Sequence, residues 1–544
     1  MWYELKAGYM DWPHVKAKLC EKVMASFEAS ATIAQFKKSL GGAEISGANP
    51  FIIIDKAATG VSQTLASRMK AVEKILSYDS LVRLSNEEKK TLWQERHFLT
   101  SRPDALFKFL QCVNWLDHTQ VLQCYRLIYK WEKPNPQQAI ELLDARYTDP
   151  MVREFAVALI DNLTDEECEQ IVLQLCQVLK YEAYHDSALA RFLLRRAYRN
   201  TKIGHRFFWN LRAELHIKEI AERYSLLLEA YVRGCGRRRE ELLNQHEVMS
   251  TLTIVAHKVK ATAMADRKEM MREVLAKSAA KLEKALDHRL LLPLDERLES
   301  SGVVVKKCKS MDSKQVPLWL VFENADPMGL KISVILKVGD DLRQDALTLQ
   351  MMRLMDNFWK KAGMNLGLNL YGCVATGKEL GMIEVVKNAE TTAGIQREAG
   401  GAKSVLQEDV LTKWLLHHNP GTQFNIAQAN FARSCAGYCV ATYVLGIADR
   451  HNDNIMITKD GFLLHIDFGH FLGNYKKKFG YQRETTPFVF TAQYAHVLRR
   501  GAKTSEAFES FRDLCARAYN CVRHEATLFL NLFQLVRCST LILS

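Results

Sequence analysis

The stretch 449–469 has the residue types and the spacing that phosphoryl transfer requires. It contains Asp-Arg-His-Asn-Asp-Asn at 449–454 and Asp-Phe-Gly at 467–469. Asn454 and Asp467 supply an amide and a carboxylate oxygen, the ligands that hold Mg²⁺ on nucleotide phosphates. Asp449 and His451 lie upstream, where an acidic or imidazole group can face the attacking hydroxyl. The pattern predicts a phosphotransferase site with Asp449, His451, Asn454 and Asp467 as catalytic residues.

Two apolar segments connect these polar residues. Ile455-Met456-Ile457 and Leu463-Leu464-His465-Ile466 flank the turn Lys459-Asp460-Gly461. Asp-Gly between such runs favours a β-hairpin, which would bring Asn454 and Asp467 to one metal ion. Asp-Phe-Gly alone is a weak signal, but in combination with the residues upstream it is specific. The alternative is two buried strands with incidental acids.

The composition is that of a large globular chain. Its 544 residues are 48% hydrophobic and 25% charged, enough for three or four domains with their own cores. No run of eighteen apolar residues occurs, and Glu4, Lys6 and Asp11 lie where a signal peptide would be apolar. We therefore expect neither a membrane span nor secretion.

The cysteines indicate the cellular compartment of the protein, and the net charge indicates the kind of partner it binds. The thirteen cysteines are scattered and odd in number, without a Cys-x-x-Cys pair, which favours reduced thiols in a cytosolic protein. A net charge of +12 fits anionic lipid as well as nucleic acid. Because the basic residues gather in one loop and no nucleic-acid module is recognised, we expect no nucleic-acid partner.

The segment 62–236 has a helical pattern throughout. Capping boxes are predicted at Ser85 with Glu88 and at Thr164 with Glu167, and the prolines 103, 136 and 150 suit first helical turns. Starts near 103 and 136, or 117 and 150, recur about every 33 residues, which indicates helix pairs of an all-α solenoid. Residues 1–61 receive no assignment, and 237–300 are predicted to be a helical linker.

From Val303 the hydrophobic period changes to that of strands. We expect strands at 303–305, 318–322, 332–337, 368–371 and 382–386, with one helix at 344–361. The predicted fold is an α+β bilobal kinase domain with an antiparallel sheet N-lobe (301–386) and a helical C-lobe (387–544). Nucleotide would lie in the cleft between the lobes.

Two further segments fit this chemistry. Lys337 ends a strand, where a kinase keeps the ammonium that pairs with an ATP phosphate, although a strand-end lysine is more often simply solvated. No Gly-x-Gly-x-x-Gly precedes it, so the turn 311–315 with Ser313 and Lys314 would cover the phosphates. After Asp-Phe-Gly, a loop carries four cations that suit an acceptor already bearing phosphates: Lys476, Lys477, Lys478 and Arg483.

These motifs resemble a class I phosphoinositide 3-kinase catalytic subunit, gamma-like or alpha-like. The shared segments are Pro317-Leu-Trp-Leu320, Lys337 with Gly339-Asp-Asp-Leu-Arg-Gln-Asp345, Tyr371-Gly-Cys373, Ser434–Thr442, Asp449–Met456, His465–His470 and Pro487-Phe488-Val489, with Tyr184–Leu194 and Leu228–Gly236 in the helical region. The likeness covers about 62–535. It implies a cytoplasmic lipid kinase that is recruited to the inner face of the plasma membrane.

The resemblance also implies roles for individual residues. ATP would be held by Ser313, Lys314, Trp319, Ile335, Lys337, Asp345, Tyr371, Glu384, Val386, Met456 and Ile466. Asn454 and Asp467 would bind Mg²⁺, and Asp449 and His451 would share the catalytic role. The cationic loop would bind phosphatidylinositol 4,5-bisphosphate, whose 3-hydroxyl is phosphorylated to give the trisphosphate.

The chain departs from that family in places, and other functions compete. Gln315 replaces a phosphate-loop lysine, and Ala448 replaces a glycine before Asp449. Both ends look truncated against the family, so a regulatory subunit and G-protein input stay open. A related serine/threonine protein kinase is one alternative. A helical scaffold weakened by its shortened C-lobe is another.

Overall fold

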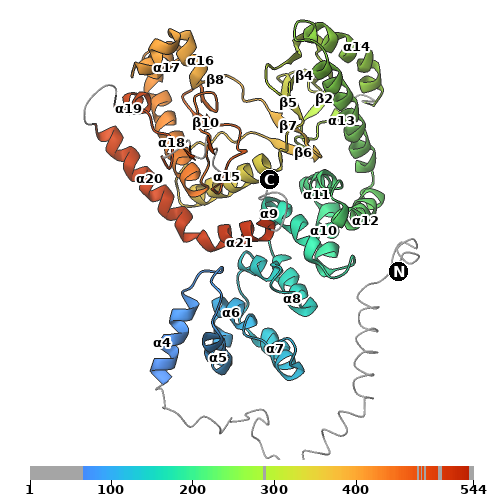
Figure 1. The fold of residues 1–544 in the computed structure, drawn as a ribbon, viewed down its shortest axis with the longest axis vertical. Helices are drawn as coiled ribbons and strands as arrows, with labels where there is room; N and C mark the ends of the chain where they lie inside the picture. Colours follow the sequence, from blue (N-terminus) through green and yellow to red (C-terminus); the bar gives the residue numbers. More distant parts are fainter. Residues whose placement is uncertain are drawn as a thin grey trace, which may run out of the picture. The chain divides into compact units, whose positions relative to one another are not determined.

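The computed structural model describes residues 65–285, 290–473, 477–478, 481–482, 486–499 and 505–537. The chain divides into two units, residues 1–68 and 69–544, and nearly all described elements belong to the second (Figure 1). The unassigned segment 1–61 lies outside the described residues. No helix in the described part of the chain is long and apolar enough to cross a bilayer.

The first region of the second unit is all helical. Its α-helices are α4 (Leu65–Leu76), α5 (Asn86–Gln94), α6 (Leu106–Leu110), α7 (His118–Lys130), α8 (Pro150–Ile160), α9 (Asp165–Val178), α10 (Ala188–Arg199), α11 (Thr201–Ala213) and α12 (Lys218–Gly234). Helix α10 packs on α8 and α12, and α11 packs on α9, so alternate helices stack in rows. The predicted solenoid is confirmed. Starts near 117 and 150 are α-helical, whereas 103 and 136 lead into 3₁₀ turns at Pro103–Ala105 and Gln138–Leu143.

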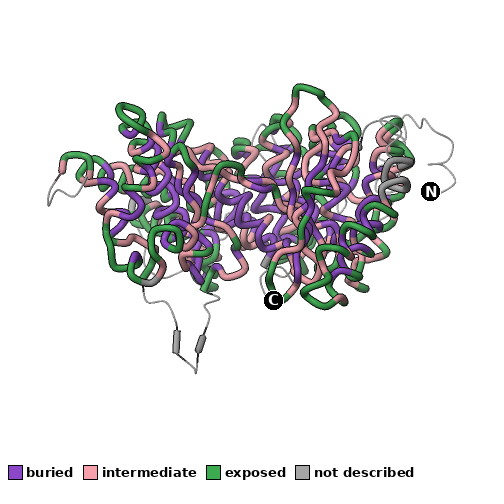
Figure 2. Tube along the Cα trace, turned by 90° about the horizontal axis from the view of Figure 1, so that it is seen from above, coloured by how far each residue is buried: buried purple, intermediate pink, exposed green. Residues whose placement is uncertain are grey.

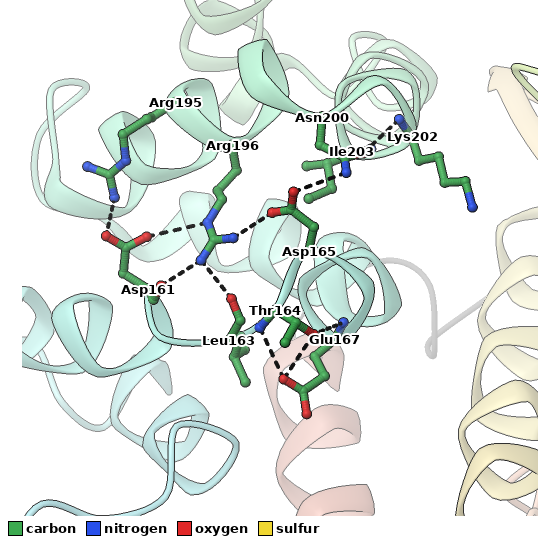
Figure 3. Close-up of polar contacts among 10 residues, drawn as sticks. All are labelled: Asp161, Leu163, Thr164, Asp165, Glu167, Arg195, Arg196, Asn200, Lys202 and Ile203. Carbon is green, nitrogen blue, oxygen red and sulfur yellow. Dashed lines mark hydrogen bonds and ion pairs between the residues drawn. The ribbon is translucent and has the colours of Figure 1, made fainter. Parts of the chain in front are cut away.

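Local signals begin the helices of this solenoid. Both predicted capping boxes form, because the side chains of Ser85 and Thr164 accept from the third helical amide while its glutamate reaches back. In Figure 3 the Arg196 guanidinium lies between two helices, where it pairs with Asp165 at 2.5 Å and donates to the Leu163 carbonyl at 2.8 Å. It thereby ties α10 to the turn that leads into α9.

The predicted linker 237–300 has a larger role than connection. Helices α13 (Arg238–Ala261) and α14 (Arg267–Ala285) pack against each other and cover strands of the sheet that follows. Helix α13 carries a stripe of buried apolar residues that includes Leu252 and Val255. Such a stripe must pack against another element, so α13 is part of the folded domain and not a free linker. The sheet also begins before residue 301, at β1 (Leu290–Leu291).

The sheet is antiparallel, as predicted, and has the strand order β1-β2-β4-β5-β7-β6, with β3 also paired to β4. The remaining strands are β2 (Glu299–Val303), β3 (Lys309–Ser310), β4 (Leu318–Asn324), β5 (Ile332–Val338), β6 (Cys373–Gly377) and β7 (Leu380–Glu384). Helix α15 (Arg343–Lys361) follows β5. On β5, Val334 and Leu336 are buried, while Ile335 and Lys337 stay partly open on the other face. This alternation leaves one face of the sheet for a ligand.

Two predicted strands are misplaced, and a third is present with shifted bounds. The segment 303–305 ends β2 and enters a 3₁₀ turn, because β2 and β3 must both pair with the single strand β4. The segment 368–371 is not a strand: the Leu370 amide donates to the Leu368 carbonyl at 3.1 Å within the segment, and Arg353 donates to the Tyr371 carbonyl at 2.7 Å. Strand β7 ends two residues before the predicted 386.

The last region is mainly helical. It contains α16 (Thr392–Glu398), α17 (Val410–His418), α18 (Gln423–Val444), α19 (Ala492–Arg499), α20 (Glu506–His524) and α21 (Ala526–Arg537), with a small sheet β8 (Ala389–Thr391), β9 (Ile455–Thr458) and β10 (Leu463–His465). Helix α18 is buried along most of its length. Figure 2 shows that buried segments (purple) run through the interior of the molecule. Helix α21 reaches α9 and the 3₁₀ turn 138–143 of the solenoid. The predicted helical C-lobe is confirmed.

Candidate active site

The predicted hairpin exists and is anchored on α18. Strands β9 and β10 pair with Leu464 opposite Met456. In the turn, Gly461 has φ of +92°, and a Cβ there would lie 2.2 Å from the Ala427 carbonyl oxygen of α18. Only glycine fits this close approach. The Ser434 hydroxyl of α18 also accepts from the Leu463 amide at 2.9 Å, so the helix fixes where the hairpin ends.

The open end of the hairpin brings the two predicted metal ligands to one place. The amide of Ile466, beside Asp467, donates to the Asn454 carbonyl at 2.9 Å. The Asn454 side chain donates its amide to the Asp449 carbonyl at 2.9 Å, which fixes the rotation of that side chain. Asp467 is exposed. An amide oxygen and an exposed carboxylate at one strand end suit a hard divalent cation.

Two of these acids have unusual backbone conformations. Asp449 and Asp467 have φ of +57° and +60°, a region that costs most side chains energy, although aspartate tolerates it better than most. The surroundings must hold such residues in place, and strain of this kind gathers at functional sites.

Arg450 holds these two strained positions together. Its guanidinium donates to the Ala448 carbonyl at 2.8 Å, to the Ile466 carbonyl at 2.7 Å and to the Asp467 carbonyl. It also lies 5.5 Å from the centre of the Phe468 ring. Sequence reasoning gave Arg450 no role, although its place between Asp449 and His451 was a signal.

Lys337 faces the hairpin end from β5. Burial would lower the pKa of Lys337, but the carboxylates of Asp467, Asp345 and Asp340 outweigh it and raise that pKa. The Asp340 carboxylate lies 3.7 Å from the ammonium, a neighbour that sequence reasoning did not single out. The lysine therefore stays charged at neutral pH, as a phosphate ligand must.

Asp345 joins helix α15 to the same place. It is 4% exposed, and its Oδ1 accepts from the Phe468 amide at 2.9 Å. Burial raises the pKa of Asp345 to about 6, while Lys337 opposes the shift. Nearby, the buried Tyr371 ring stacks on Phe468 with centroids 6.4 Å apart. Asp345 and Tyr371 thus both contact Phe468, and their place at the back of a nucleotide pocket stays a prediction.

The residues predicted around the nucleotide base come from both lobes. Trp319 is opposite Ile335 in the sheet, on the face that carries Lys337. Met456 and Ile466 lie on the hairpin side and, like Val386, are partly buried. The Glu384 side chain points back instead, because its Oε2 accepts from the Gly372 amide at 2.8 Å. The Glu384 amide is engaged as well, because it donates to the Gly372 carbonyl at 2.8 Å.

The predicted phosphate loop is a short turn between β3 and β4. Ser313 and Lys314 are exposed on it, and the Met311 amide donates to the Pro317 carbonyl at 2.8 Å. The side chain of Gln315 turns away from these two residues and accepts from the Lys260 ammonium of α13.

The other predicted residues divide between described and undescribed parts. The His451 ring is about two-fifths exposed, and its Nδ1 accepts from the Asp453 amide at 3.2 Å. Of the cationic loop, Lys476 and Arg483 lie outside the described residues, as do the side chains of Lys477 and Lys478. The backbone of these two lysines forms β11 (Lys477–Lys478), paired with β12 (Tyr481–Gln482).

Comparison with known proteins matches both regions. Residues 62–244 match the phosphoinositide 3-kinase family accessory domain (PIK domain), and residues 331–543 match phosphatidylinositol 3- and 4-kinase. The chain therefore contains an accessory domain and a kinase domain of the phosphoinositide kinase type. The accessory domain is the solenoid, and the kinase domain carries Asn454, Asp467 and Lys337.

The relatives extend over both domains. Phosphatidylinositol 3-kinase 2 of Dictyostelium discoideum is 50% identical over 474 residues, which are 87% of this chain and 25% of that protein. Phosphatidylinositol 3-kinase 1 of the same organism is 50% identical over 466 residues, 85% of this chain and 29% of that protein. Phosphatidylinositol 3-kinase 3 is 41% identical over 472 residues. The chain spans less than a third of the length of these curated relatives.

Proposed function

We propose that this chain transfers the γ-phosphate of ATP to the 3-hydroxyl of phosphatidylinositol 4,5-bisphosphate at the inner face of the plasma membrane. The observation that carries the proposal is the meeting of Asn454 and Asp467 at the end of one hairpin, with the charged Lys337 facing them. Phosphoryl transfer depends mainly on positioning and on neutralising phosphate charge, and this arrangement supplies both.

The cleft offers each part of ATP a suitable surface. Trp319, Ile335, Met456 and Ile466 provide apolar surface for the base, and the Glu384 carbonyl and the backbone of Val386 would provide hydrogen bonds. Lys337 would contact the inner phosphates. Ser313 and Lys314 would cover the outer ones.

The donor set fits magnesium. Asp467 is an exposed carboxylate in a cluster whose negative charge already raises the pKa of Lys337, and Asn454 adds a neutral oxygen. When bound, Mg²⁺ would neutralise phosphate charge. Arg450 would hold the residues that face the phosphates, because its guanidinium donates to the carbonyl of Ala448, just before Asp449, and to the carbonyl of Asp467.

The geometry suggests how Asp449 and His451 divide their work. Because Nδ1 of His451 accepts a backbone hydrogen bond, the neutral ring carries its proton on Nε2. His451 is then a donor to a phosphate oxygen rather than a base. The proton of the attacking hydroxyl is left to Asp449, which is 7% exposed.

The cationic loop gives the proposal its lipid substrate. The backbone of Lys477 and Lys478 pairs with that of Gln482 and Tyr481, and the four cations of this loop fall within eight residues of the sequence. Clustered cations favour a headgroup that carries phosphates over a neutral protein loop.

The test is a phosphorylation assay with the purified chain and Mg-ATP on separate vesicles of phosphatidylinositol, its 4-phosphate and its 4,5-bisphosphate. We expect 3-phosphorylated product with preference for the bisphosphate. Replacing Lys476, Lys477 and Lys478 by alanine should shift that preference and leave ATP hydrolysis intact. Serine phosphorylation without lipid turnover would indicate a protein kinase. ATP binding with no transfer to any acceptor would indicate a scaffold.

A further inference from the structure

Helix α15 makes contacts through two opposite faces, one toward the accessory domain and one toward the catalytic hairpin. Arg343 and Gln350 are about two turns apart and share one face, whereas Asp345 is rotated from Arg343 by roughly 200° and lies on the opposite one. The first face lies against the accessory domain, because α15 packs on α9. The second face supplies Asp345 to the Phe468 amide at 2.9 Å. One rigid element thus touches both the accessory domain and the catalytic hairpin end.

Glu214 is the charged group on the accessory side of this contact. It follows α11 and is 1% exposed. Its Oε2 lies 2.7 Å from the Lys180 ammonium, and its Oε1 accepts from Gln177 at 2.9 Å and from Arg343 at 3.2 Å. A carboxylate this buried needs such partners, and one of its two cations comes from the kinase domain.

Arg343 carries the contact into the turn between β5 and α15. Its second guanidinium nitrogen pairs with Asp341 at 2.6 Å, and its own amide donates to the same carboxylate at 3.0 Å. The neighbouring Asp340 pairs with Lys337 at 3.7 Å. The guanidinium therefore joins an accessory-domain acid to the turn beside the phosphate-binding lysine.

A second polar contact keeps α15 from rotating. Gln350 and Gln174 of α9 hydrogen-bond through their amides with both residues buried, and Gln350 also donates to the Gln170 carbonyl. Two fixed points on one face set the rotation of a helix. The direction of Asp345 on the other face follows from them.

We propose that Glu214 is a positioning residue of the kinase domain, which acts through Arg343 and α15 to hold Asp345 against the Phe468 amide beside Asp467. The inference rests on the proposed function. The mechanism is mechanical coupling, since Glu214 itself does not touch the hairpin end. The accessory domain is then part of the catalytic apparatus, through one buried carboxylate.

The test compares hydrogen exchange in the whole chain with Glu214→Gln and a matched control, Glu229→Gln. Glu229 is also an accessory-domain glutamate, but it pairs with Arg233 at 2.6 Å at the surface of α12. We expect Glu214→Gln to speed exchange of the Phe468 amide about tenfold, with the control unchanged. Faster exchange confined to residues near 214 and 343 would overturn the inference. Should Glu214→Gln fail to fold, Arg343→Lys replaces it in the test. Lysine keeps the positive charge of Arg343 but loses the planar guanidinium that binds two carboxylates at once.

A kinetic arm separates positioning from stability. Assayed well below its unfolding temperature, Glu214→Gln should lower kcat about tenfold and change KM for ATP less than twofold. A purely structural role would lower the unfolding temperature and leave kcat per folded molecule unchanged, which would contradict the proposal. If the wild-type chain transfers no phosphate, the proposed function fails, and the exchange comparison decides the coupling by itself.

Discussion

The accessory domain and the kinase site treat buried charge in opposite ways. In the accessory domain Arg153 pairs with Glu182 through Nε and Nη2, the latter at 2.6 Å, with both side chains nearly fully buried, and its Nη1 donates to backbone carbonyls. In the kinase site three carboxylates, Asp340, Asp345 and Asp467, influence one lysine. In the accessory domain each of these buried charges has an opposite charge beside it, which suits a rigid scaffold. In the kinase site the carboxylates outnumber the lysine, which leaves room for a bound cation.

The largest expected effect comes from removing a carboxylate on the unbalanced side. Asp467→Asn should lower phosphate transfer by about a thousandfold or more, because a metal ligand and charge are lost together. Stability should change little, since relief of the repulsion between Asp467 and Asp345 offsets the lost attraction between Asp467 and Lys337. Lipid kinase assays and thermal unfolding of the same preparation check both statements. Activity within tenfold of wild type would remove Asp467 from the catalytic role.

On the balanced side, breaking a pair should cost stability instead of activity. Arg153→Met leaves the Glu182 carboxylate buried without its cation, and we expect a loss of about 3–5 kcal/mol in the free energy of unfolding. Denaturant titration measures it. Arg191→Met is the control, because Arg191 pairs with Asp186 at the surface, and it should cost less than about 1 kcal/mol. Equal losses would show that burial does not decide the difference.

One accessory-domain acid departs from this balance. Burial raises the pKa of Glu141 to about 7, because its nearest cation, Arg146, lies 3.8 Å away and its bond from Asn531 is neutral. In the unfolded chain Glu141 loses its proton near pH 4.5, whereas in the folded chain it keeps the proton up to about pH 7. The free energy of unfolding therefore falls as the pH rises from about 4.5 to 7. Glu141→Gln should therefore stabilise the chain by roughly 2 kcal/mol at pH 8 and hardly at pH 4. Unfolding curves at both pH values check this, and an equal effect at each would contradict it.

The smallest effect concerns the phosphate loop. Gln315→Met removes the bond from Lys260 and should raise KM for ATP about two- to fivefold with kcat unchanged, as expected for one exposed hydrogen bond. Steady-state kinetics with varied ATP measure it. Lys258→Met, on the same helix but without a bond to the loop, should leave KM unchanged. A matching change in that control would point to the overall charge of α13.

Local signals predicted the elements that carry the candidate site. The turn Asp460-Gly461 between apolar runs was enough to place the hairpin, and the strand-length run 332–337 placed Lys337 near the end of β5, which continues to Val338. The capping boxes of α5 and α9 were also found, because a cap depends only on its own first turn.

Contacts between distant segments could not be predicted in this way. Nothing near Glu214 in the sequence marks it as the partner of Arg343, and Arg450 acts through carbonyl groups that only the folded chain brings together. The charged helices α13 and α14 suggested a linker, although they cover the sheet. The segment 368–371 alternates like a strand, but a side chain of α15 satisfies its backbone.

The contact of α21 with the solenoid has a consequence for biosynthesis. Asn531 of α21 donates to the buried Glu141, 390 positions earlier in the chain, and α21 also packs on α9. On the ribosome, these early helices emerge long before their covering helix is made. The contact can form only after α21 has been made, so the surfaces of α9 and of the turn 138–143 that it covers stay exposed in the nascent chain until then, and exposed surface of this kind favours aggregation.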